Sequence, residues 1–403
     1  MDALETVKGL TAFPARAPGS DAERRAARWL AKRLRDADRA TETETHWVRP
    51  QWPVVHAFHV VLAIAGSVVS VDEPAIGAGI LGAALVSYAL DLSGRAYLLR
   101  RLTPQRATQN VIAPAPAASG ATSESPLRLV ISAHYDAGRS GLVYRSTVQR
   151  LHARLMRLAR GHAPGGLGLV LWGIALVTAA AAAHAAGVSG TVLRIVQLVP
   201  TVGLMIGLAL VIDIALSQPV PGANDPASGV AVALALAAAL DRAPPANLGV
   251  EVVLAGAGEG PALGMRAYVR ARRKRLAREA TAVIHLAPCG RGRPRWWTSD
   301  GVIPPLRFHP RLLQLCAEIA RDEGHLGAGP HVGHGISGAY AARAARFPAV
   351  TIGCLDDDEL VPSSHQHADV PDRLEPQALR AALEFCLALV DRLDADVGRR
   401  RRG

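Results

Sequence analysis

Four long apolar stretches interrupt an otherwise polar chain of 403 residues. They cover residues 54–71, 74–92, 165–188 and 191–216, and each is close to the ~20 residues that a helix needs to cross a bilayer. They are rich in Ala, Gly, Leu and Val and are apolar on all sides, as membrane helices are. The pattern therefore predicts four transmembrane helices. The alternative interpretation is that these helices are buried in a protein core.

The short gaps within each pair of stretches predict two helical hairpins. Asp72 and Glu73 separate the first two stretches, and a short Gly/Ser turn separates the last two. Two hairpins leave every polar segment on one side of the membrane. The predicted division is a transmembrane hairpin at 53–92, a second at 164–217, and one discontinuous polar domain made of residues 1–52, 93–163 and 218–403.

The net charge of +11 is carried almost entirely by arginine, and many of these arginines flank the hairpins. The flanking residues are Arg95, Arg100, Arg101, Arg106, Arg145, Arg150, Arg154, Arg157 and Arg160. The positive-inside rule then predicts an integral protein of a bacterial-type plasma membrane with its polar domain in the cytoplasm. No zinc-finger spacing or RNA-binding aromatic motif accompanies the basic charge, so nucleic acid is not an expected partner.

Residues 144–161 have an amphipathic pattern. Val148, Leu151, Leu155 and Leu158 recur at helical spacing, with arginines on the opposite face. The pattern suits a helix that lies on an anionic membrane surface. An ordinary solvated basic helix explains it equally well.

The polar domain alternates between predicted strands and helices. The predicted strands are 40–47, 110–113, 127–133, 250–255, 281–286 and 349–354. The predicted helices are 22–37, 230–241, 261–277, 309–323, 338–346 and 376–394. Such alternation predicts an α/β domain in which a mostly parallel mixed sheet lies between two helical layers. The run of arginines at 399–402 is expected to be a frayed end.

Residues of the kinds that bind metals lie at the ends of successive predicted strands. His134 and Asp136 follow one strand, and Glu259 follows another. Asp225 lies in a turn before an apolar helix, from which a carboxylate points outward and can meet a hard cation. Side chains at the ends of neighbouring strands are how an open α/β sheet builds a site.

Taken in order, these motifs resemble the zinc aminopeptidases of metallopeptidase family 28. That family includes bacterial leucyl aminopeptidases, glutaminyl cyclases and transferrin-receptor-like proteins. The segments that carry the resemblance are Phe13–Ser20, Ala133–Asp136, Gly222–Gly229, Leu263–Val269 and His365–Asp372. The resemblance implies a three-layer zinc-exopeptidase-like domain.

The resemblance also implies roles for five side chains. Asp225 corresponds to the carboxylate that bridges two zinc ions, and Glu259 and His365 correspond to the other ligands of one of them. His134 corresponds to a ligand of the second zinc. Asp136 corresponds to the acid that orients His134 from behind, which fixes the imidazole tautomer.

Two positions depart from the family pattern. The family has two adjacent glutamates, of which the first is the general base, but this chain has Gly258 before Glu259. The family also has an Asp ligand where this chain has Ala287. In addition, Gly338 stands where family members often have an Asp.

These departures reduce the metal site that the chain can build. Asp225, Glu259 and His365 suffice for one zinc with an open position, whereas a second zinc would have only His134 and a shared Asp225. Family glutaminyl cyclases use one zinc with an Asp-Glu-His set, but they keep an acidic residue at the position of Gly258. Because a positioned base contributes about 10²–10⁴-fold to rate, its absence predicts weak or lost peptidase activity.

Three hypotheses follow from this chemistry. The first is a membrane-anchored pseudoenzyme-like protein with at most one zinc, which binds a peptide or a membrane-proximal protein. The second is an active membrane metallo-aminopeptidase in which His285 replaces the base. The third is a metal-free binding scaffold. In all three, the second hairpin is inserted between His134 and Asp225, so the cleft is expected to lie close to the bilayer.

Overall fold

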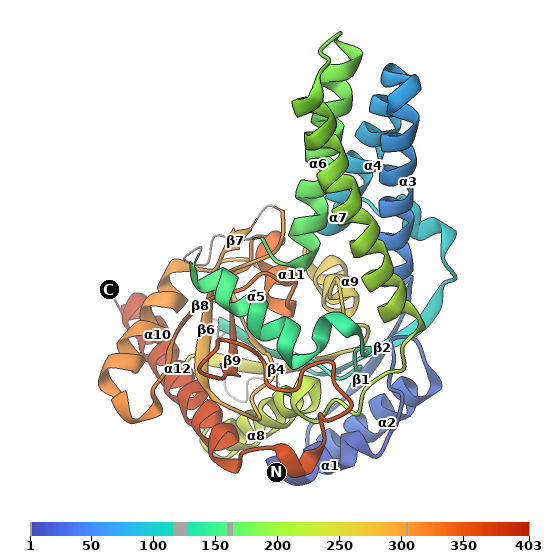
Figure 1. Cartoon of the computed structure of the whole chain (residues 1–403). Coiled ribbons are helices and arrows are strands. Elements are labelled where there is room, and N and C mark those ends of the chain that lie inside the picture. Colours follow the sequence, from blue (N-terminus) through green and yellow to red (C-terminus); the bar gives the residue numbers. More distant parts are fainter. Residues whose placement is uncertain (1, 116–126, 159–163, 304, 403) are drawn as a thin grey trace.

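The computed structural model describes residues 2–115, 127–158, 164–303 and 305–402. The last residues of the amphipathic stretch, 159–161, lie outside this part. The described chain forms an α/β domain from which a bundle of four long helices rises (Figure 1).

A nine-stranded mixed sheet forms the centre of the α/β domain. Its order is β1-β2-β4-β3-β5-β9-β6-β7, and β8 pairs with β6. The central strands β4, β3, β5 and β9 are parallel, while β1, β2, β6 and β7 pair antiparallel at the two sides. The strands are β1 Glu42–Val48, β2 Arg106–Ala113, β3 Leu127–His134, β4 Leu248–Ala255, β5 Thr281–Leu286, β6 Arg293–Asp300, β7 Leu306–Arg307, β8 Gly329–Val332 and β9 Ala349–Leu355. All six predicted strands are present, and β6, β7 and β8 are additional.

Helices cover both faces of the sheet, as predicted. Along β3, Leu129 and Ile131 pack into one core cluster and Val130 into the other, because successive side chains of a strand point to opposite faces. The helices of the first face are α1 Ala3–Thr11, α2 Asp21–Arg35, α8 Gly229–Arg242, α10 Pro310–Asp322 and α12 Pro376–Arg402. Those of the second face are α9 Leu263–Arg272 and α11 Gly338–Ala344. Helix α1 is not among the predicted helices.

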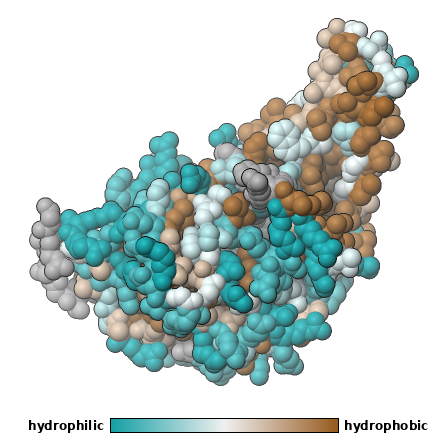
Figure 2. Space-filling model, turned by 60° about the vertical axis from the view of Figure 1, so that its left-hand side comes forward, coloured by the Kyte–Doolittle hydropathy of each residue, from teal (hydrophilic) through white to brown (hydrophobic). Residues whose placement is uncertain are grey.

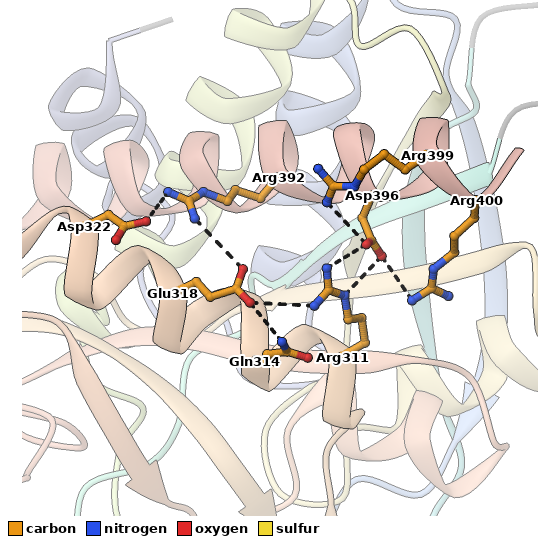
Figure 3. Close-up of polar contacts among 8 residues, drawn as sticks. All are labelled: Arg311, Gln314, Glu318, Asp322, Arg392, Asp396, Arg399 and Arg400. Atoms are coloured by element: carbon orange, nitrogen blue, oxygen red, sulfur yellow. Dashed lines mark hydrogen bonds and ion pairs between the residues drawn. The ribbon is translucent and has the colours of Figure 1, made fainter. Parts of the chain in front are cut away.

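The expectation of a frayed carboxyl-terminal end is wrong, because α12 continues to Arg402. A network of ion pairs between α10 and α12 holds this end of the helix (Figure 3). Asp396 accepts from Arg311 at 2.6 Å and also pairs with Arg399 and Arg400. The hydrogen bond from Arg311 lowers the pKa of Asp396, so the carboxylate stays charged. The terminal arginines are thus neutralised in part by a carboxylate one turn earlier.

The four predicted membrane segments are helices, and the face of their bundle that Figure 2 shows is largely apolar. They are α3 Trp52–Asp72, α4 Pro74–Ser93, α6 Gly166–Ala185 and α7 Thr191–Leu216. Each is long and apolar enough to cross a membrane, and between 11% and 44% of its most apolar window is buried. The segment 223–242, which contains α8, also meets these criteria but is 83% buried, so it is a core helix.

Polar side chains join the bundle helices to one another. Ser67 of α3 and Thr201 of α7 are hydrogen-bonded at 2.8 Å. The amide of Gln197 on α7 donates to the carbonyl of Ser67 at 2.8 Å. Because lipid offers no competing partners, such bonds are a typical way for helices to associate in membranes.

The amphipathic stretch forms helix α5, Ser146–Leu158. Its apolar side chains Val148, Leu151, Leu155 and Leu158 are exposed by between 42% and 82%. The prediction of an amphipathic helix is therefore confirmed. Its contact with a membrane surface stays a prediction.

Candidate active site

The carboxyl ends of the parallel strands bring the predicted residues to one edge of the sheet. His134, the last residue of β3, lies beside Ala255, the last residue of β4. Ser132 of β3 lies beside His285 of β5, and its hydroxyl is 3.0 Å from Nδ1 of that histidine. This edge is where an open α/β sheet is expected to hold a site.

The turn that presents Asp225 is fixed by a buried carboxylate. Both oxygens of Asp369 accept main-chain hydrogen bonds, from Asn224 at 2.7 Å and from Asp225 at 3.0 Å. Burial raises the pKa of Asp369 to about 7, although these two bonds favour its charged form. The hydroxyl of Ser364 donates to the Asp225 side chain itself. Ser364 and Asp369 flank His365, so one loop positions two candidate ligands.

Arg16 joins the loop that follows His134 to the turn that carries Asp225. Its buried guanidinium donates to the carbonyl of Tyr135 at 3.0 Å and to that of Pro221 at 3.0 Å. Burial lowers its pKa to about 10, while the nearby carboxylates of Asp136 and Asp369 oppose this shift. Arg16 belongs to the N-terminal motif noted in the sequence, which did not reveal that the residue organises the site.

His365 and Glu259 face each other with a separation that suits a shared ion. Nδ1 of His365 is 2.8 Å from the carbonyl of Arg139, which makes this nitrogen the donor and leaves Nε2 with its lone pair. Nε2 lies 3.6 Å from Oε1 of Glu259. The ring of Tyr144 stacks on His365 with centroids 4.1 Å apart. No pattern in the sequence predicts this role of Tyr144.

Both members of the pair have shifted pKa values. Burial raises the pKa of Glu259, and the neighbouring His365 partly offsets this. Burial opposes charge on His365, but the carboxylates of Glu259 and Asp225 outweigh it and raise the pKa of the imidazole.

The role of Asp136 as the acid that orients His134 stays a prediction. No hydrogen bond joins Asp136 to His134 in the part of the chain that the structure describes. Its two oxygens accept instead from the amides of Gly258, at 2.6 Å, and Glu259, at 2.9 Å. Asp136 thus positions the loop that carries Glu259, because the two main-chain donors compete successfully for the carboxylate.

A cavity of about 260 Å³ opens between these loops. His365 lies beside it, next to Glu259. Predicted site positions that line it are His134, Asp225, Gly258, Glu259, His285, Ala287 and Gly338.

Comparison with known proteins shows a similarity over the carboxyl-terminal part of the chain. Residues 211–390 match the model of peptidase family M28. This part of the chain is similar to peptidase family M28. The matched region contains Asp225, Glu259 and His365. No curated protein matches the chain.

Solved structures with this fold align with nearly the whole chain. A glutaminyl cyclase from Bacteroides thetaiotaomicron is 14% identical, covers 97% of this chain and 96% of its own, and gives a TM-score of 0.55. A zinc aminopeptidase from Bacillus subtilis is 13% identical, covers 96% and 94%, and also gives 0.55. A leucine aminopeptidase precursor from Bacteroides thetaiotaomicron is 15% identical, covers 97% and 96%, and gives 0.53. At these identities the likeness concerns the fold.

Two departures from the family pattern, Gly258 and Gly338, lie where a side chain would clash. A Cβ atom at Gly258 would lie 2.2 Å from Cβ of His134, so no side chain fits there while His134 keeps its place. A Cβ atom at Gly338 would lie 2.6 Å from Nδ1 of His285. Each glycine therefore leaves room for an imidazole. The glycine at 338 is thus explained by its packing against His285.

His285 faces the cavity, as predicted for a substitute base. However, burial and the nearby His134 lower its pKa to about 3, so its neutral ring has little affinity for a proton. A general base works best when its pKa is near the operating pH. His285 therefore lies where a base could act, but its pKa is too low for a general base.

Asp300 is a further carboxylate in the cavity lining, which sequence reasoning missed because β6 was missed. Burial raises its pKa. Its oxygens accept from the amides of Gly301, at 3.0 Å, and Ser337, at 2.9 Å. These bonds indicate that Asp300 fixes the start of α11.

The donor set fits one zinc ion if Asp225 approaches the other two ligands. A nitrogen and an oxygen 3.6 Å apart, as in His365 and Glu259, can both reach zinc at about 2.0–2.2 Å. Within the described residues, the one group of three with all ligand atoms inside 4.8 Å is Glu323, His325 and Glu384, two of which are exposed. Asp225 is thus farther from the pair than in a closed zinc site.

The site lies at the foot of the second hairpin, as the insertion point predicts. The amide of Leu142 donates to Asp213 of α7 at 2.6 Å, and the guanidinium of Arg139 donates to the carbonyl of Ser217 at 2.5 Å. The main-chain carbonyl of the same Arg139 accepts from His365. At the other foot, a Cβ atom at Gly165 would be 3.1 Å from His334. The distance to a bilayer stays a prediction.

Proposed function

We propose that the chain is a membrane-anchored M28 peptidase-like protein whose site holds one zinc ion and has weak or no aminopeptidase activity. The observation that carries the proposal is the contact between Gly258 and His134. It leaves no room for a carboxylate where the family has its general base. Zinc use is implied by the family and by zinc aminopeptidases of the same fold.

Asp225, Glu259 and His365 would hold the ion, and His134 would face it from across the cavity. A bound zinc supplies Lewis acidity, which polarises a carbonyl and acidifies water. The protein's own residues hold this set in place. Arg139 fixes the tautomer of His365, Asp136 fixes the loop of Glu259, and Asp369 fixes the turn of Asp225.

The membrane anchor rests on the four apolar helices, whose surfaces are mostly exposed. The arginines beside the hairpins favour a cytoplasmic α/β domain in a bacterial-type plasma membrane. A site without its base, held next to such an anchor, suits binding of a peptide or of a membrane-proximal protein segment.

A working aminopeptidase is the second candidate, and the position of His285 in the cavity lining favours it. The metal-free scaffold is the third candidate.

An assay of purified protein on aminoacyl substrates separates activity from its absence. We expect wild type and His285→Ala to hydrolyse these substrates equally slowly, at least about 100-fold below a zinc aminopeptidase with an intact base. Substantial wild-type activity that His285→Ala abolishes would instead establish the substituted-base enzyme.

A further inference from the structure

A second and larger cavity lies at the foot of the first hairpin, away from the candidate zinc site. It has a volume of about 750 Å³ and is formed by the end of β1, the segment that follows α4, and helix α9. Its charged lining consists of arginine, and no carboxylate residue is among its lining residues. The six arginines are Arg49, Arg95, Arg100, Arg101, Arg266 and Arg270.

Five of the six arginines have no acidic partner. Arg100 is neutralised by a buried bidentate pair with Asp91, with distances of 2.7 and 2.8 Å. For the other five, no ion pair with a carboxylate occurs within the described ranges. Of these five, Arg49 and Arg266 are half-buried, and Arg95, Arg101 and Arg270 are exposed. So many unpaired cations around one cavity repel one another, and an anion in the cavity would relieve that repulsion.

Two buried polar atoms of this cavity lack a partner. Nη2 of Arg266 and the hydroxyl of Tyr97 are both shielded from solvent and make no hydrogen bond. The Nε atom of Arg266 donates to the carbonyl of Pro261 at 2.7 Å, which fixes the guanidinium. Buried donors are nearly always satisfied in proteins. A fixed donor on Arg266 and an unpartnered hydroxyl on Tyr97 therefore point to a ligand that carries acceptor oxygens.

The main chain is shaped to hold Arg266 in this place. Gly94 has a φ of +68°, and a Cβ atom there would lie 2.1 Å from Nη1 of Arg266. The glycine lets the chain that leaves α4 pass directly over the guanidinium.

The edge of the cavity is apolar and adjoins the hairpin. Trp47 is 69% exposed and Leu98 is 46% exposed, and both line the cavity. Trp47 precedes the start of α3 at Trp52, and Leu98 follows the end of α4 at Ser93. Exposed tryptophan and basic residues at the end of membrane helices are typical of the interface with lipid headgroups.

We propose that this cavity binds the phosphate-bearing headgroup of an anionic lipid. The planar guanidinium groups match the oxygens of a phosphate, and the apolar edge suits the glycerol and acyl region of a lipid rather than a free anion. The proposal rests on the membrane anchor of the proposed function but not on its zinc site.

The test uses the full chain in detergent, with lipid binding measured by native mass spectrometry and by the rise in Tm on addition of lipid. We expect phosphatidylglycerol to bind and to raise Tm more than phosphatidylcholine does. The double variant Arg266→Gln/Arg270→Gln should bind phosphatidylglycerol about 10-fold or more weakly. The matched control Arg28→Gln/Arg278→Gln removes two exposed arginines that do not line the cavity, and it should bind as wild type does.

A parallel measurement with inorganic phosphate distinguishes a lipid headgroup from a free phosphate ion. An equal rise in Tm with phosphate and with phosphatidylglycerol would assign the cavity to a free anion and overturn the lipid proposal. Equal binding by wild type and the cavity variant would overturn the site. The fraction of each protein that sediments with membranes is measured in parallel. Recovery of the chain without membranes would refute the proposed membrane anchor. A membrane-bound chain with no preference between lipids would refute the cavity proposal alone.

Discussion

Replacement of Asp225 by Asn is expected to lower zinc affinity by more than about 100-fold, since even changes behind a ligand cost about 10–100-fold. Asn keeps the shape of the side chain and the main-chain bond to Asp369, but it removes the charge that attracts the ion. Isothermal titration with zinc, or competition with a chelator, measures the loss.

The matched control is Asp357→Asn, the same change at an exposed carboxylate away from the cavity lining. It should bind zinc as wild type does. If Asp225→Asn keeps both the zinc content and the Tm of wild type, the chain is a scaffold whose carboxylate does not bind zinc.

Replacement of Gly258 by Glu is expected to destabilise the protein without creating an aminopeptidase. The new Cβ would overlap Cβ and Cγ of His134, at 2.2 and 2.5 Å. Overpacking of this kind costs about 1–3 kcal/mol, which thermal unfolding detects as a lower Tm. Restoring the residue type of the family therefore does not restore the family's base.

The control for size and charge is Gly324→Glu, because a Cβ atom at Gly324 meets nothing within 4 Å. Its Tm should stay close to that of wild type. The double change Gly258→Glu/His134→Ala makes room for the carboxylate and should recover part of the lost Tm. A stable Gly258→Glu single variant with strong aminopeptidase activity would show that His134 yields easily and that the steric account is mistaken.

The sequence predicted those parts of the fold that depend on long apolar runs. The buried parallel strands β3, β4 and β5 and the four bundle helices follow from such runs. Strand β6 was missed because its residues, Arg293–Asp300, mix arginine, tryptophan and polar side chains without a clear alternation. Helix α12 exceeded its predicted end because a carboxylate on its own surface neutralises the terminal arginines.

The candidate site was predictable as a set of residues but not as a set of contacts. Order along the chain and position at strand ends were enough to place His134, Asp225 and Glu259 around one cavity. The hydrogen-bond donors to Asp136 were not predictable, because they are main-chain amides that reach the carboxylate only once the loop of Glu259 has folded. The cause of the glycine at 258 is also three-dimensional, since His134 is 124 positions away along the chain.

The zinc content of the purified wild-type chain tests the central claim most directly. Inductively coupled plasma mass spectrometry on protein equilibrated with zinc and then freed of loosely bound metal gives ions per chain. One tightly bound zinc is the predicted result, because Asp225, Glu259 and His365 supply three ligands, which is enough for one zinc with an open position. Two tightly bound zinc ions per chain would contradict it.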